Sequence, residues 1–176
     1  MMESKSDKPS NNNDNLSQGY EKLLKRAEKT LSSVAERTED TLSQALNKAK
    51  EKAVELEELT QEEADNVHKF VTRDLYSAGL HLVEEERNIA DWLRLNLVLI
   101  EKTVLQRFTA LSQAAKLELD HLNKAKQRFD EWHTGEVTTI GTLSCRSCGE
   151  QIQFEHTGRI PPCPKCHATV FERVKS

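Results

Sequence analysis

Two C-x-x-C pairs constrain this sequence more than any other feature. Cys145 and Cys148 form the first pair, and Cys163 and Cys166 follow after fourteen residues. Each pair can make a tight turn that aims both sulfurs at one point, and two such turns complete the tetrahedron of thiolates that zinc prefers. Gly149 suits the left-handed conformation that such a turn often needs. The spacing predicts one structural zinc ion, and a site with four protein ligands adds folding energy rather than catalysis.

Other uses of these cysteines fit the sequence less well. All four lie within 22 residues and the preceding 144 residues contain none, whereas a disulfide framework would cross-link the rest of the chain as well. Four thiolates also suit iron, but the segment has few aromatic residues to shield a redox centre. His156 and His167 lie nearby, yet four cysteines already fill the tetrahedron. We therefore expect zinc, with Cys145, Cys148, Cys163 and Cys166 as its ligands.

The rest of the chain is typical of long helices. Between positions 16 and 133 there is no proline, and Glu, Lys, Leu, Ala, Gln and Arg dominate. Beyond position 133 the sequence becomes β-branched and alternating, which indicates short strands. We expect a mainly α fold in which long helices, as a hairpin or coiled-coil-like, precede a small C-terminal β zinc ribbon. The expected division is a disordered tail at 1–15, a helical region at 16–133 and the zinc ribbon at 134–176.

An eleven-residue repeat runs through positions 27–59. Two apolar columns recur in it: Leu31, Leu42 and Ala53, and Val34, Ala45 and Leu56. This period predicts a nearly straight helix with a narrow apolar stripe. Thr60 and Glu63 then predict a capping box and a new helix start. The stripe continues and is widest at 80–105, the expected buried centre, with a further helix start at Asn88.

Several strings around the cysteines resemble the YbeL-like family of bacterial zinc-ribbon proteins. They are His133-Thr-Gly135-Glu136-Val137, Gly141-Thr-Leu143-Ser-Cys145-x-x-Cys148, Cys163-Pro164-x-Cys166 and Phe171-x-Arg173, with Glu58-Leu59-Thr60 and Arg73-Asp74-Leu75 among the helices. The resemblance spans about residues 20 to 174. It implies a helical N-terminal region and a zinc ribbon, with the four cysteines matching position by position. It implies little about activity.

The sequence predicts a non-enzymatic protein. It contains no Gly-rich phosphate loop, nucleophile elbow or H-E-x-x-H pattern. No signal sequence is visible and no apolar run is long enough to cross a bilayer, so we expect a cytoplasmic protein. The helices then serve as a spacer or oligomerisation element, and the ribbon as an interaction module for a protein partner. Loss of metal, as in Cys163→Ser, is expected to unfold the chain from about residue 136 onward and to leave the helices intact, because the helices have their own apolar stripe.

Three other functions remain open from the sequence. A nucleic-acid-associated, transcription-related factor is disfavoured by the net charge of −4 and by a ribbon with only five basic residues against four acidic ones. A thiol-based redox or zinc-responsive switch would release the metal on oxidation. A lipid-surface role for positions 27–59 is disfavoured because their stripe lacks large aromatic residues.

Overall fold

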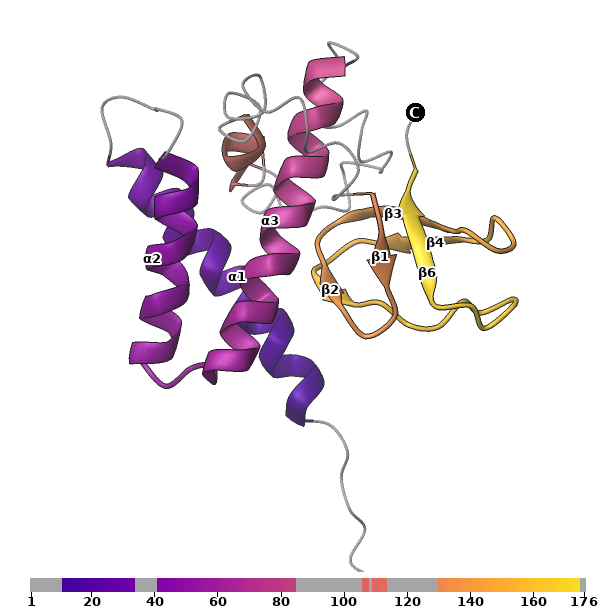
Figure 1. Ribbon diagram of the computed structural model, residues 1–176, viewed down its shortest axis with the longest axis horizontal. Helices are drawn as coiled ribbons and strands as arrows, with labels where there is room; N and C mark the ends of the chain where they lie inside the picture. Colours follow the sequence, from indigo (N-terminus) through magenta and orange to yellow (C-terminus); the bar gives the residue numbers. More distant parts are fainter. Residues whose placement is uncertain (1–10, 34–40, 85–105, 108, 114–129, 175–176) are drawn as a thin grey trace, which may run out of the picture.

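The computed structural model describes residues 11–33, 41–84, 106–107, 109–113 and 130–174 (Figure 1). Helices α1 (Asn11–Ser32), α2 (Thr41–Glu55) and α3 (Gln61–Glu84) pack together on one side, and a small β ribbon lies on the other (Figure 1). The ribbon contacts α1 and α3. None of the described helices combines the length and apolar character that a membrane span requires.

Helices α1 and α2 are built on the same apolar spacing. The buried apolar side chains of α1 are Tyr20, Leu23, Leu24, Ala27 and Leu31, and those of α2 are Leu42, Ala45, Leu46, Ala49 and Ala53. Offsets of 0, 3, 4, 7 and 11 place each set on one helix face. Both faces pack against each other and against α3. Each buried leucine contributes about 1.5 to 3 kcal/mol, so this shared core holds the three helices together.

The continuous helix expected over positions 27–59 is wrong. Helix α1 ends at Ser32 and α2 begins at Thr41, and the two helices pack against each other. Leu56, which the repeat placed in an apolar column, lies beyond the end of α2 with 49% of its surface exposed. A hairpin buries both halves of the stripe inside one chain, whereas a straight helix would leave them exposed.

The turn between α2 and α3 contains two local signals, one of which the sequence predicted. The capping box is confirmed: the Thr60 amide donates to the Glu63 carboxylate at 2.9 Å, and the Glu63 amide donates to the Thr60 hydroxyl at 3.2 Å. Before it, Glu57 adopts a left-handed conformation with φ of 53°. The Glu58 amide donates to the carbonyl of Ala53 at 3.0 Å, which is the Schellman ending of a helix.

The ribbon contains six short strands: β1 (Trp132–His133), β2 (Val137–Thr138), β3 (Gly141–Cys145), β4 (Gln151–Phe154), β5 (Gly158–Arg159) and β6 (Val170–Arg173). Strands β1, β6, β3 and β4 form an antiparallel sheet in that order, and β2 pairs with β5. Two ribbon residues, Val137 and Ile140, are buried in the same apolar cluster as the helices. The ribbon therefore completes the helical core instead of lying apart from it.

The element boundaries differ from the expected ones at both ends of the helical region. Helix α1 begins at Asn11, inside the segment expected to be a disordered tail. Strand β1 occupies 132–133, which was expected to be helical. Most of the expected apolar centre at 80–105, and the helix start at Asn88, lie outside the described residues.

Candidate metal centre

The two C-x-x-C turns have the same backbone geometry. In the first, the Gly149 amide donates to the carbonyl of Cys145 at 2.8 Å. In the second, the His167 amide donates to the carbonyl of Cys163 at 2.9 Å. The residue after each pair is left-handed, with φ of 73° at Gly149 and 61° at His167. The sequence indicated this conformation for the glycine only, because other residues adopt it uncommonly, although histidine is one of the residues that do so more often.

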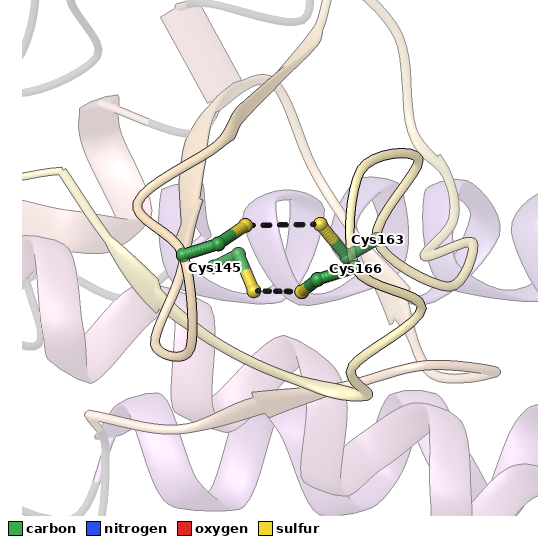
Figure 2. A group of neighbouring side chains, drawn as sticks. Cys145, Cys163 and Cys166 are labelled. Carbon is green, nitrogen blue, oxygen red and sulfur yellow. Dashed lines mark hydrogen bonds between the residues drawn. The ribbon is translucent and has the colours of Figure 1, made fainter.

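These turns bring the four cysteine sulfurs together. All four sulfur atoms lie within 4.8 Å of one another, and the pairs Cys145–Cys166 and Cys148–Cys163 are each 3.6 Å apart (Figure 2). Cys145 and Cys163 are buried, Cys148 is half-buried and Cys166 is exposed. Among the described residues this is the only group of three or more His, Cys, Asp or Glu side chains close enough to share a metal ion. Neither His156 nor His167 belongs to it.

The electrostatics of the cluster favour a bound cation. Burial would raise the pKa of the Cys163 thiol, but the backbone N–H groups of Cys166 and Lys165 lower it to about 6. The backbone N–H of Ala168 acts to lower the pKa of the Cys166 thiol, but the neighbouring sulfurs outweigh it and raise that pKa to about 12. Crowded thiolates repel one another, and a metal dication removes that repulsion. The donor set and its crowding fit a tetrahedral metal such as zinc.

Comparison with known proteins agrees with this geometry. The family model described as "Zinc-ribbon containing domain" matches residues 29–175. The chain belongs to this zinc-ribbon family. The match covers α2, α3 and all six strands, so the family includes these two helices as well as the cysteines, whereas most of α1 lies before the matched residues. Together the family and the four-cysteine cluster point to a metal ion, with zinc as the metal that the family description names.

The curated relatives of this zinc-ribbon protein include the "Uncharacterized protein YbeL" of Escherichia coli (strain K12), which is 24% identical over 128 residues. That alignment covers 73% of this chain and 79% of the relative. The protein of the same name from Escherichia coli O157:H7 matches equally well. The resemblance to YbeL-like proteins is thus confirmed. No solved structure shows a significant match to the chain.

A second polar cluster, which the sequence did not predict, joins the ribbon to the helices. At its centre is Asp74 of α3, whose side chain is fully buried. One carboxylate oxygen accepts hydrogen bonds from the Trp132 indole at 2.8 Å and from Arg73 at 3.1 Å. The other accepts from the Tyr20 hydroxyl at 2.8 Å and, in the ribbon, from the Thr138 hydroxyl at 2.9 Å and the Thr139 amide at 3.0 Å.

Two arginines complete this cluster, which we call the Asp74 network. Arg73 donates to Glu136 and, at 3.2 Å, to the carbonyl of Val137. Arg173 of β6 lies 4.0 Å from the Asp74 carboxylate and donates to the carbonyl of Ile140 at 3.1 Å. Both guanidinium groups lie over the Trp132 ring, with centroid distances of 4.9 and 5.1 Å.

The Asp74 network keeps its central carboxylate ionised. Burial would raise the pKa of Asp74, but the charges of Arg73 and Arg173 and the hydrogen bonds from Trp132 and Tyr20 outweigh it, so the pKa is lowered. Burial and the adjacent carboxylate both raise the pKa of Tyr20 well above its ordinary value. Tyr20 therefore remains a neutral hydroxyl donor, as a bond to an ionised carboxylate requires.

Proposed function

We propose that the chain is a non-enzymatic zinc protein in which Cys145, Cys148, Cys163 and Cys166 bind one structural zinc ion and the ribbon serves as an interaction module for a protein partner. The observation that carries the zinc assignment is the convergence of four sulfurs within 4.8 Å on two equivalent turns. Four thiolates leave no coordination position for a reactive water, so the metal stabilises the ribbon.

Metal analysis tests the zinc assignment. Protein purified without added metal should contain close to one zinc ion per chain. The double variant Cys145→Ser, Cys163→Ser should lose it, because two of four thiolates are removed. Ser144→Ala, which changes the residue next to Cys145 without removing a sulfur, should retain it. A zinc ratio near zero, or stoichiometric iron, in the unmodified protein would contradict the assignment.

The exposed end of the ribbon supports the choice of interaction surface. The turns at 146–149 and 164–167 lie at the end of the ribbon that points away from the helices (Figure 1). In the second turn, Pro164, Lys165, Cys166 and His167 are all exposed. The opposite end is occupied by its contacts with α1 and α3. A partner that docks on the ribbon therefore has the metal-binding end available to it.

The charges on the ribbon favour a protein partner over nucleic acid. Arg146 forms ion pairs with Glu131 and Glu172, and Lys165 lies 3.9 Å from Glu150. The basic side chains thus alternate with acidic ones instead of forming a cationic stripe. Phosphate affinity grows with the number of cations presented, so a mixed surface binds nucleic acid poorly.

Site-specific cross-linking tests the interaction surface. A photoreactive residue at Lys165 should cross-link to a protein in the native host, and the yield should fall when zinc is removed. The same residue at Lys52, exposed on α2, is the matched control and should not give that product. Cross-links to nucleic acid at Lys165, or equal products at both positions, would contradict the proposal.

Self-association through the helical region is a further part of this proposal. The apolar stripe of 67–122 in the sequence motivates it, although the described stripe residues Val67, Val71, Ala78 and Leu111 are already buried in the core of one chain. Sedimentation of the full chain at tens of micromolar should show a concentration-dependent dimer that persists after zinc removal. A monomer throughout that range would contradict it.

A further inference from the structure

Strand β6 connects the metal-binding end of the ribbon to the Asp74 network. It lies inside the sheet, between β1 and β3. Phe171 of β6 is opposite Cys145 in β3 and opposite Trp132 in β1, and its side chain is fully buried. The same strand therefore packs beside a metal-ligand residue and beside a donor to Asp74.

Arg173 lies two residues further along β6, on the same face of the strand as Phe171. Its side chain is only 1% exposed. It donates to the Thr138 hydroxyl at 2.9 Å, and that hydroxyl in turn donates to Asp74. A change in the position of β6 would therefore withdraw a charge and disturb a hydrogen bond at the same carboxylate.

Asp74 depends on the ribbon for most of its partners. The Trp132 indole, the Thr138 hydroxyl and the Thr139 amide all come from ribbon residues, whereas Tyr20 and Arg73 belong to the helices. A buried carboxylate is stable only while it is paired and hydrogen-bonded. If the ribbon loosens, α3 holds a buried charge without enough partners.

The metal is the main constraint on the cysteine-bearing end of the ribbon. The sheet is small, and its apolar cluster contains only a few large side chains, among them Trp132, Leu143 and Phe171. A segment of this size seldom folds without a metal or a disulfide. Metal loss is therefore expected to release β3 and β6 together, since Cys145 and Phe171 are paired across them.

We propose that metal occupancy of the four-cysteine site controls the stability of the α1–α3 packing, with β6, Arg173 and Asp74 as the connection. The inference rests on the proposed zinc site but not on the proposed interaction role. It replaces the expectation that the helices remain intact without metal. The stability of the helical part then depends on whether the ribbon holds its metal, although none of the four proposed ligands belongs to a helix.

Hydrogen exchange on the full, reduced chain tests this connection. Removal of zinc with a chelator should speed amide exchange in 64–78 of α3 by roughly tenfold or more, since a foldon that loses its support opens more often. Zinc content is measured on the same samples.

Two ribbon variants separate the connection from general loosening. Arg173→Met should still bind zinc, since no cysteine is changed, but its α3 should exchange quickly with zinc present and respond little to the chelator. Arg159→Met, on the ribbon surface, should behave as the unmodified chain does.

Unchanged α3 exchange after zinc removal from the unmodified chain would overturn the proposal, and that result does not depend on any variant folding. So would an Arg173→Met response equal to that of Arg159→Met. A preparation that contains no zinc overturns both this connection and the zinc assignment, whereas a zinc-loaded protein with insensitive helices overturns the connection alone.

Discussion

Replacing Asp74 with asparagine keeps the shape of the side chain and removes its charge. In the native structure one oxygen accepts from the Trp132 indole N–H at 2.8 Å, and the other accepts from the Thr139 backbone N–H at 3.0 Å. Asparagine has one oxygen and one NH₂ group. Whichever way the amide turns, its NH₂ group faces one of these two N–H donors. One buried donor is therefore left without an acceptor in either orientation.

The size of the effect follows from what is left unpaired. An unsatisfied buried donor costs about 1 to 3 kcal/mol. Arg73 and Arg173 also lose the ionised partner 3.0 and 4.0 Å away from them, and removing one member of a buried charge pair costs about 3 to 5 kcal/mol. Both costs arise from loss of the same carboxylate, so they overlap instead of adding, and we expect Asp74→Asn to lower the free energy of unfolding by about 3 to 5 kcal/mol. That is a large fraction of the roughly 5 to 15 kcal/mol that holds a typical domain.

Urea denaturation of zinc-loaded protein, followed by far-UV circular dichroism, measures this loss. The midpoint should fall by about 2 M urea for Asp74→Asn, given a slope near 2 kcal/mol per M. Asp65→Asn on the same helix is the matched control, because Asp65 is exposed and pairs with Lys50 at the surface. Its midpoint should barely move, since exposed ion pairs contribute little. Equal midpoints for the two variants would refute the argument that the buried carboxylate joins the two halves.

Three further predictions concern single backbone or side-chain features. Gly149→Ala should destabilise the ribbon by about 1 to 2 kcal/mol, because φ is 73° there; since no atom lies near the new Cβ, the loss comes from the backbone conformation alone. Gly158→Ala is the control, and equal zinc-dependent melting of the two variants would contradict the conformational argument. Glu57→Gly should raise the thermal midpoint, with a gain of up to about 1 kcal/mol, because glycine is the preferred residue at a left-handed helix ending; a lower midpoint would contradict it. The phenolate absorbance of Tyr20 should appear only on unfolding at high pH: because its folded pKa is raised, its stabilisation is complete below the unfolded pKa of about 10 and is lost as the pH rises through the folded pKa. Because Tyr76 also contributes phenolate absorbance, the Tyr20 signal is taken as the difference from Tyr20→Phe, and a difference that develops reversibly near pH 10 in folded protein would contradict the prediction.

The convergence of the four cysteines was predictable because its geometry is local. A C-x-x-C turn is defined by four residues, so the sequence identifies the cysteines that can converge and the glycine that follows the first pair. His167 was missed because a histidine is only a weak signal for a left-handed backbone, although it occupies the position equivalent to Gly149. The capping box at Thr60 was predictable for the same reason, since all its groups lie within one turn of helix.

The hairpin of α1 and α2 was not predictable from apolar spacing. A stripe with offsets of 3, 4, 7 and 11 is the same whether its residues face a second helix of the same chain or a partner subunit. Whether the stripe forms a hairpin or one straight helix depends on where the helix ends, and the apolar repeat in the sequence continues across that point. Ala45 and Ala53 were therefore assigned correctly to the buried face, while the straight helix that was meant to carry them was wrong.

The Asp74 network had an indirect signal in the sequence. The strings that resemble YbeL-like proteins include Arg73, Asp74, Glu136 and Arg173. The sequence suggested a role for the cysteines in these strings but none for these four residues. Their contacts join residues far apart in the chain, for example Tyr20 with Asp74 and Asp74 with Thr139. No local period or spacing connects such positions. A resemblance identified the residues, and only the three-dimensional contacts explain them.

A polar joint has a different consequence from an apolar one of equal area. Apolar surfaces pack in many orientations at similar free energy, whereas the Asp74 carboxylate is satisfied only when Tyr20, Trp132 and Thr139 approach it from α1, β1 and the residue after β2 at once. A shift of the ribbon by one residue along α3 would leave these donors unpaired inside the protein, at a cost of about 1 to 3 kcal/mol each. The network thus favours one orientation of the ribbon over its alternatives. Because that orientation directs the cysteine turns away from the helices (Figure 1), the same buried carboxylate that stabilises the joint also leaves this end of the ribbon open for the proposed partner.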